Sequence, residues 1–179
     1  MPDTAKLDER MTSGDVRAEP LTEAHRATLK AACSEDADIW HLYMADFGPE
    51  GFDASFDGLL ARPTPVFALF QGDRLVGMST YLNIDEEPGM LEIGTTYLRP
   101  DVRGTGLNRR IKDMMIRHAL DCGYSTICFR VDARNQRSQA AVLKLGAAQV
   151  RIDEKDRTTW TGHVRDTIVF HLDARTWQG

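Results

Sequence analysis

The sequence is poor in cysteine and in the residue spacings that hold metal ions. Its three cysteines are odd in number and show no spacing typical of a disulfide framework or a metal site. None of its five histidines has a second histidine four residues away. We therefore expect no metal site, and we interpret the cysteines as reduced thiols of the core: Cys33, Cys122 and Cys128.

Long apolar runs and excess positive charge are also missing. No stretch approaches the roughly 20 apolar residues that cross a membrane, and the first fifteen residues lack the apolar centre of a signal peptide. The chain has 22 basic and 27 acidic residues, a net charge of −5, which argues against a general nucleic-acid binder. We expect a cytoplasmic protein with no membrane partner.

Repeats and low-complexity segments are absent as well. The 179 residues contain 42% hydrophobic and 27% charged residues, ordinary values for a globular chain of one domain. We expect residues 1–14 to form a disordered lead-in and residues 15–179 to form a single domain.

The common glycine motifs for nucleotides are incomplete, but one glycine run stands out. Arg103-Gly104-Thr105-Gly106-Leu107-Asn108 has Asn108 where a dinucleotide fingerprint has its third glycine, and no Gly-Lys-Ser/Thr follows as in a P-loop. The run joins a predicted strand (90–98) to a predicted amphipathic helix (107–122). This order exposes backbone N–H groups to a phosphate, although a plain short turn also favours glycine.

Basic residues gather around this run. Between Arg99 and Arg117 six basic residues stand against two acidic ones, although the whole chain is acidic. Three of them occupy the first turns of the predicted helix, where the helix dipole disfavours cations: Arg109, Arg110 and Lys112. A bound anion would stabilise this arrangement, so the sequence predicts a phosphorylated ligand.

The hydrophobic pattern predicts a mixed α/β sheet. Strands are expected over 16–21, 66–71, 75–83, 90–98, 126–131, 149–153 and 167–172. Helices are expected over 22–33, 37–47, 107–122 and 135–146, with a hairpin turn at Gly72-Asp73 and an irregular segment over 48–57. The order predicts antiparallel pairing first and a crossover at the glycine run.

Three blocks of the sequence resemble the GNAT acetyltransferases, which bind acetyl-CoA. Arg103-Gly104-Thr105-Gly106 fits the family pattern Arg/Gln-x-x-Gly-x-Gly/Ala, and Gly-Thr-Gly-Leu-Asn is common in its RimJ/RimL-like branch. The other blocks are 132–141 with Leu145-Gly146-Ala147, and 162–170. The N-terminal third matches in pattern only. The resemblance implies a GNAT fold, which is an α/β (α+β) architecture. Its central sheet is mixed, mostly antiparallel, with about six to seven strands, and about four helices flank it.

The resemblance also implies which residues hold acetyl-CoA. Backbone amides of the run Gly104, Thr105, Gly106, Leu107 and Asn108, beside Arg103, would bind the pyrophosphate. Main-chain groups of Thr96 and Leu98 would pair with the pantetheine arm. Asn135 and Ser138 would meet the pantetheine and the region of the sulfur, although Asn135 is also a good N-cap and Ser138 a first-turn residue.

Acetyl transfer needs an unprotonated amine and a proton for the departing thiolate. Deprotonating a lysine at pH 7 costs roughly 4–5 kcal/mol, whereas an α-amino group costs only about 1–1.4 kcal/mol. Glu92 is the candidate base, since several GNAT enzymes place a catalytic glutamate eleven residues before the position of Arg103. Strand alternation predicts that Glu92 shares a face with Thr96 and Leu98; a solvent-facing or ion-paired carboxylate is the alternative.

Ser138 is the first candidate for the acid, by resemblance to the branch, and an orienting hydrogen bond is its alternative role. Tyr97 is the second candidate, although alternation points it away from Glu92. Candidates for the acceptor pocket come from the N-terminal helices and the late hairpin: Trp40, His41, Tyr43, Met44, Phe47, Trp160 and His163. Core packing is the alternative for the aromatic ones. The acidic turn Asp85-Glu86-Glu87 could attract a cationic acceptor or be solvated only.

The sequence therefore predicts an acetyl-CoA-dependent N-acetyltransferase of the RimJ/RimL-like branch, with direct attack in a ternary complex. The leading acceptor is a protein N-terminal amine, followed by a small-molecule amine such as a polyamine, an amino acid or an antibiotic. A CoA-binding regulatory module without turnover and a nucleotide-binding protein are the rivals from other classes. A homodimer through edge strands or the late hairpin fits the same pattern.

Overall fold

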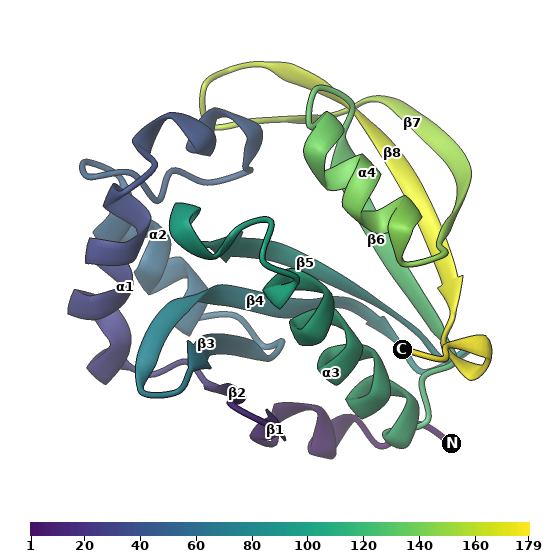
Figure 1. The fold of residues 1–179 in the computed structure, drawn as a ribbon. Coiled ribbons are helices and arrows are strands. Elements are labelled where there is room, and N and C mark those ends of the chain that lie inside the picture. Colours follow the sequence, from purple (N-terminus) through teal and green to yellow (C-terminus); the bar gives the residue numbers. More distant parts are fainter.

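One mixed sheet of eight strands forms the centre of the molecule, in a computed structural model that describes residues 1–179. The strand order is β1-β2-β3-β4-β5-β6-β8-β7, and β5–β6 is the single parallel pair (Figure 1). The strands are β1 (Met11–Ser13), β2 (Val16–Pro20), β3 (Val66–Gln71), β4 (Arg74–Asp85), β5 (Met90–Leu98), β6 (Thr126–Asp132), β7 (Ala148–Thr158) and β8 (Val164–Asp173).

Four α-helices cover the two faces of this sheet (Figure 1). A buried apolar cluster lies on each face. One contains side chains of α3 and the end of α4 together with Leu91 and Ile93, and the other contains side chains of α1 and α2 together with Tyr97. None of the helices has the length and apolar character required to cross a membrane. The helices are α1 (Arg26–Ser34), α2 (Phe52–Leu60), α3 (Leu107–Asp121) and α4 (Gln136–Lys144).

The two central strands separate soon after they meet. Met90–Glu92 of β5 pairs with Thr126–Cys128 of β6, and no pairing follows. Beyond this point β5 stays with β4, and β6 stays with β8 (Figure 1). The sheet therefore consists of two halves that are joined along three residue pairs.

A bulge in β5 changes which face its residues occupy. The register with β4 shifts between the pairs Met78–Tyr97 and Thr80–Gly94, and Thr95 adopts a positive φ of 46°. Before the bulge Leu91 and Ile93 face α3, whereas after it Leu98 faces α3 and Tyr97 faces the opposite cluster. Strict alternation would have placed Tyr97 with Ile93.

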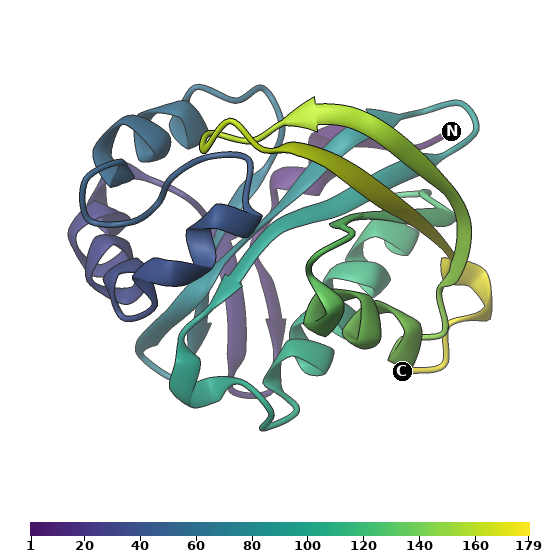
Figure 2. The ribbon, with the colours of Figure 1, turned by 90° about the horizontal axis from the view of Figure 1, so that it is seen from above.

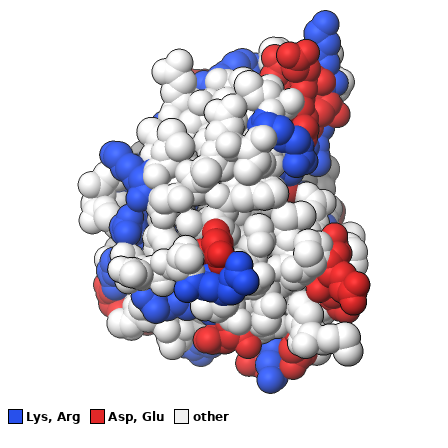
Figure 3. Space-filling model, turned by 90° about the vertical axis from the view of Figure 1, so that its right-hand side faces the viewer, with Lys and Arg blue, Asp and Glu red and all other residues white.

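The hairpin of β7 and β8 bridges the separated halves. Figure 2 shows it extending from the sheet toward the N-terminal helices. At its tip, Trp160 Nε1 donates a 2.8 Å hydrogen bond to the carbonyl of Trp40, which lies in the 3-10 helix Ala37–Leu42. On the side of the molecule shown in Figure 3, acidic and basic residues lie in small scattered groups between uncharged residues.

Several sequence predictions need correction in the N-terminal third. Residues 1–14 are ordered, as a 3-10 helix (Thr4–Asp8) and strand β1, because Leu7 and Met11 are buried in the core. Within residues 37–47 only a short 3-10 helix forms (Ala37–Leu42), whereas α2 begins at Phe52, inside the segment 48–57 that was expected to be irregular. The helical spacing of buried side chains in α2 was present in the sequence: Phe52, Phe56 and Leu59.

Candidate functional site

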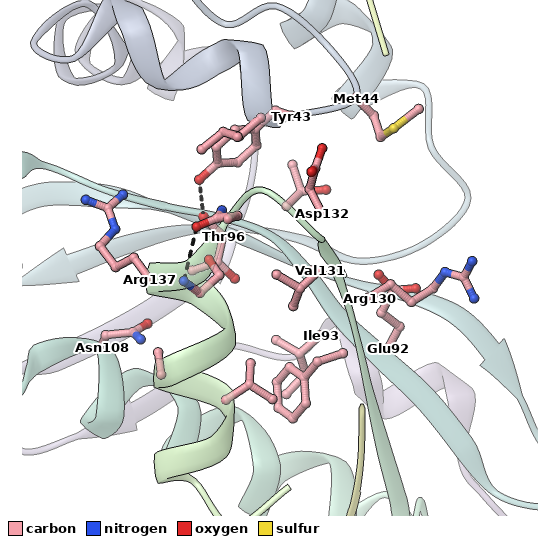
Figure 4. A pocket seen from close by; sticks show the side chains of 18 of the residues that line it. Tyr43, Met44, Glu92, Ile93, Thr96, Asn108, Arg130, Val131, Asp132 and Arg137 are labelled. Carbon is pink, nitrogen blue, oxygen red and sulfur yellow. Dashed lines mark hydrogen bonds between the residues drawn. The ribbon is translucent and has the colours of Figure 1, made fainter. Parts of the chain in front are cut away.

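A cleft of about 620 Å³ occupies the space where β5 and β6 separate. It has two sides: Asn108 and Arg137 mark the side of α3 and α4, and Glu92 and Arg130 mark the opposite side (Figure 4). We call these the α3 side and the Glu92 side.

The N-terminus of α3 presents free backbone donors on the α3 side. The first helical hydrogen bond runs from the amide of Arg110 to the carbonyl of Gly106, and the amides of Asn108 and Arg109 have no backbone partner. Gly104 and Gly106 have φ values of 75° and 88°, which favour glycine, and a side chain at either would meet open space. The turn can therefore receive a phosphate without a steric barrier.

Most of the residues predicted to bind acetyl-CoA line this one cleft. They are Thr96, Leu98, Arg103, Gly104, Asn108, Asn135 and Ser138. Three others of the glycine run do not line it: Thr105, Gly106 and Leu107. Leu107 is buried in the core, and the Thr105 hydroxyl donates to the carbonyl of Val102. These side chains shape the turn, so any role of the three at a ligand would come from their backbone.

Side chains of the protein already occupy both main-chain acceptors predicted for pantetheine. The carbonyl of Leu98 accepts a 2.8 Å hydrogen bond from Arg103 Nε, and that of Thr96 accepts a 2.6 Å bond from the hydroxyl of Tyr43. Arg103 also pairs with Asp36. A carbonyl has a second lone pair, so a ligand can share these oxygens but does not find them free.

The basic residues at the start of α3 each contact another part of the protein. Arg109 donates to the carbonyl of Lys144, and Arg110 pairs with Asp15. Lys112 is turned into the protein instead, and it lines the cleft. Each of the three cations therefore has a partner within the protein, and a role for them beside a bound phosphate stays a prediction.

Lys112 is a buried cation with no carboxylate beside it. It is 5% exposed, and its Nζ donates a 2.5 Å hydrogen bond to the hydroxyl of Thr96, its single side-chain partner. Burial lowers the pKa of Lys112 to about 7. The sequence predicted Lys112 only as one of the cations near a bound anion, because no pattern in the sequence signals that one lysine of a basic helix is buried.

Asn135 caps α4, as the sequence allowed. Its Oδ1 accepts a 3.1 Å hydrogen bond from the amide of Ser138, whereas the Ser138 hydroxyl has no partner in the protein, and Ser138 lines the cleft. The preceding turn is fixed by Asp132, whose carboxylate accepts three hydrogen bonds from the backbone and guanidinium of Arg134. This turn positions the start of α4 at the cleft.

Glu92 lies at the last paired position of β5, where the strands begin to separate. It is 6% exposed, and Asn83 donates a 2.5 Å hydrogen bond to its Oε2. Burial raises the pKa of Glu92 above its ordinary value, although the Asn83 hydrogen bond and the charge of Arg130 oppose this. A buried carboxylate with a raised pKa is suited to accept a proton.

The bulge in β5 overturns the predicted arrangement around Glu92. Leu98 lies on the α3 face and Glu92 on the other, so they do not share a face. Tyr97 shares the face of Glu92, but it is buried and its hydroxyl donates to the carbonyl of Ala32. Tyr97 is therefore no candidate acid.

The candidates for an acceptor pocket divide into two groups. Tyr43, Met44 and Phe47 line the cleft, whereas Trp40 is fully buried in the N-terminal core. Four others lie away from the cleft lining: His41, Trp160, His163 and the acidic turn 85–87. In that turn Glu86 accepts a hydrogen bond from Thr4.

Solved structures with the same fold exist at low sequence identity. An acetyltransferase candidate from T. thermophilus is 29% identical with a TM-score of 0.84, and the alignment covers 94% of this chain and 91% of that one. A GCN5-related N-acetyltransferase from Brucella melitensis is 22% identical with a TM-score of 0.86, over 95% and 80% of the two chains.

An acetyltransferase from Salmonella typhimurium that modifies the N-terminal serine of ribosomal protein L7/L12 also shares the fold. It is 13% identical with a TM-score of 0.80, over 92% of this chain and 99% of that one. No curated protein matches the sequence. The family model of the acetyltransferase (GNAT) domain matches residues 16–148, most of the chain. The protein therefore belongs to the GNAT family and is an N-acetyltransferase that uses acetyl-CoA.

Proposed function

We propose that this enzyme acetylates a protein N-terminal α-amine by direct attack on acetyl-CoA in a ternary complex, and that it belongs to the RimJ/RimL-like branch. The observation that carries the mechanism is the position of Glu92. This buried carboxylate stands at the point where β5 and β6 separate, across the cleft from the free amides of α3. Two substrates can meet between the two sides.

On the α3 side, the proposed donor site uses the glycine turn and α4. The amides at the start of α3 bind the pyrophosphate, and the β5 edge at Thr96 and Leu98 lies along the pantetheine arm, with Asn135 and Ser138 on the other wall. Arg103 supports this site from behind by fixing the carbonyl of Leu98. Ordered in this way, the thioester lies near the point of separation.

On the opposite side, Glu92 accepts a proton from the incoming ammonium, directly or through water. The free amine then attacks the carbonyl carbon, and the C–S bond breaks. An α-amino group suits this base better than a lysine, because it gives up its proton at a cost lower by about 3 kcal/mol at pH 7. The shared fold of the L7/L12 enzyme supports the same acceptor class.

Two groups can supply the departing thiolate with a proton or a hydrogen bond. Ser138 has a free hydroxyl on the cleft wall. Lys112, whose pKa burial lowers to about 7, also lines the cleft. A group with this pKa is half protonated at neutral pH, which favours proton donation.

The test is release of CoA thiol from acetyl-CoA with a panel of peptides that differ in their first residues, and with small amines. We expect Glu92→Gln to lower kcat/KM by about 100-fold or more. In the wild-type protein, kcat/KM should fall as the pH drops through the raised pKa of Glu92, since only the carboxylate accepts a proton.

Binding of CoA to Glu92→Gln, measured by calorimetry, is the control and should be unchanged. An unaltered pH profile in the variant would remove Glu92 from the mechanism. Binding of CoA without thiol release for any amine would indicate a regulatory module instead of an active enzyme.

A further inference from the structure

Four arginines surround Glu92 on its side of the cleft. Arg62 follows α2, Arg130 lies on β6, Arg157 on β7 and Arg165 on β8, and all four line the cleft. The positive charges of Arg130, Arg157 and Arg165 act on the carboxylate of Glu92, and Glu92 in turn acts on Arg62. None of the four forms an ion pair with Glu92.

Two of these arginines have carboxylate partners. Arg130 Nη2 lies 3.1 Å from Asp153 and 2.8 Å from Asp156, and Arg157 Nε lies 3.5 Å from Asp156. These contacts join β6 and β7 across the outer part of the sheet. Carboxylates of the protein itself therefore neutralise the positive charges of Arg130 and Arg157.

The other two arginines, Arg165 and Arg62, have no carboxylate partner. Arg165 is 6% exposed, and its single hydrogen bond runs from Nε to the hydroxyl of Thr167 at 2.8 Å. The guanidinium of Arg62 makes no hydrogen bond, and its Nη1 is buried without a partner. Burial lowers the pKa of both groups, although arginine remains charged at neutral pH.

A buried guanidinium without a partner is destabilising. The negative charges of Asp132 and Asp156 act on Arg165, and that of Glu92 acts on Arg62. None of these carboxylates forms a hydrogen bond or an ion pair with either guanidinium, since Asp132 is bound by Arg134 and Glu92 accepts from Asn83. The cleft thus holds two guanidinium groups without a carboxylate partner, beside the proposed base. Guanidinium groups bind carboxylate and phosphate oxygens in a bidentate manner.

We propose that the acceptor of this enzyme carries an anionic group, a carboxylate or a phosphate, a few bonds from its amine, and that Arg62 and Arg165 bind this group. The inference rests on the proposed acetyl transfer at Glu92. An acidic side chain near a peptide N-terminus and the acid group of a small amine offer the same chemistry. A polyamine does not, because its cations would face unpaired arginines.

The experiment compares matched acceptors by thiol release. One arm uses peptides that begin Ser-Glu, Ser-Gln or Ser-Lys; the other uses glutamate against glutamine and phosphoethanolamine against ethanolamine. We expect kcat/KM to be about 10- to 100-fold higher for the anionic member of at least one arm, in line with hydrogen bonds to charged groups. The arm that responds identifies the source of the anion.

Variants connect this preference to the two arginines. Arg62→Gln and Arg165→Gln should each reduce the preference toward unity, with CoA affinity unchanged, and Arg62→Lys should retain part of it. Arg175→Gln, which removes an exposed arginine paired with Asp173, is the matched control and should keep the full preference. Thermal unfolding of each variant separates loss of recognition from loss of the fold.

The outcomes distinguish the two proposals. Equal kcat/KM for anionic and neutral members, or a preference for the cationic peptide, would overturn the anionic acceptor and leave acetyl transfer intact. An anionic preference that survives in both Gln variants would overturn the assignment to Arg62 and Arg165. Absence of thiol release with every amine would reject the proposed function and this inference together.

Discussion

At the scale of single residues, Lys112 shows how the site is maintained at the expense of stability. Its ammonium group is buried beside Thr96 with one hydrogen bond and no counter-ion. An isolated charge in such a place opposes folding, and proteins that keep one commonly use it in function. The pKa of about 7 makes this cost dependent on pH.

Lys112→Met should therefore stabilise the protein more at low pH than at high pH. Below pH 7 the wild-type lysine is charged when folded and unfolded, so its full burial cost is present; the cost shrinks between pH 7 and 10.5, where the folded lysine is neutral. We expect a gain of roughly 3–5 kcal/mol at pH 6 and about 2 kcal/mol at pH 9. Urea unfolding at the two pH values measures both.

Thr96→Val provides the comparison for this variant, since it removes the hydroxyl that Lys112 contacts and leaves the charge in place. It should lower stability at pH 6. A gain in Lys112→Met that is equal at both pH values would mean that the added apolar volume, and not the lost charge, stabilises the protein.

At the scale of secondary structure, the bulge of β5 arranges the cleft. It places Tyr97 on the face of Glu92 and Leu98 on the face of α3, so one strand serves both sides. Gly94 lies at this bulge, beside the side chain of Glu92. A Cβ added there would lie 2.9 Å from Glu92 Oε1 and 2.9 Å from Leu82 Cδ1, which forces the carboxylate to move.

Gly94→Ala should therefore damage chemistry more than donor binding. We expect kcat to fall by about 10- to 100-fold, because small displacements of a catalytic group have effects of this size. The affinity for CoA, measured by calorimetry, should change by less than about twofold, since the donor contacts lie on the other face. Equal losses in kcat and in CoA affinity would contradict the separation of the two sides.

The elements around the glycine run could be predicted because their signals are local. The strand Met90–Leu98, the start of α3 at Leu107 and the cap Asn135 agree with the sequence predictions. The bulge could not be predicted, since alternation assumes a regular strand and Thr95 is an ordinary strand residue. Arg62 and Arg165 were missed because their presence in one cleft depends on the path of the whole chain.

At the scale of the whole molecule, the two halves of the sheet are joined weakly. Three residue pairs connect β5 to β6, and the Trp160–Trp40 hydrogen bond connects the hairpin tip to the N-terminal half (Figure 2). Both halves of the sheet line the cleft between them. One half contributes α3 and β5, and the other half contributes α4 and β6. A ligand that fills it must therefore act as an additional connection between the halves.

Acetyl-CoA should raise the melting temperature through this connection. At a concentration 100 times its Kd, binding adds about 2.7 kcal/mol to the free energy of unfolding. For a chain of this size, that corresponds to a shift of roughly 5–10 °C. Differential scanning fluorimetry measures the shift, and ATP and NAD at the same concentration are the controls. Hydrogen exchange of backbone amides should be slower with acetyl-CoA than without it at residues 94–98 and 104–109, where the unpaired edge of β5 and the free donors of α3 meet the ligand. A larger shift with ATP or NAD than with acetyl-CoA, or protection confined to one half, would contradict a donor site that spans the separation of β5 and β6.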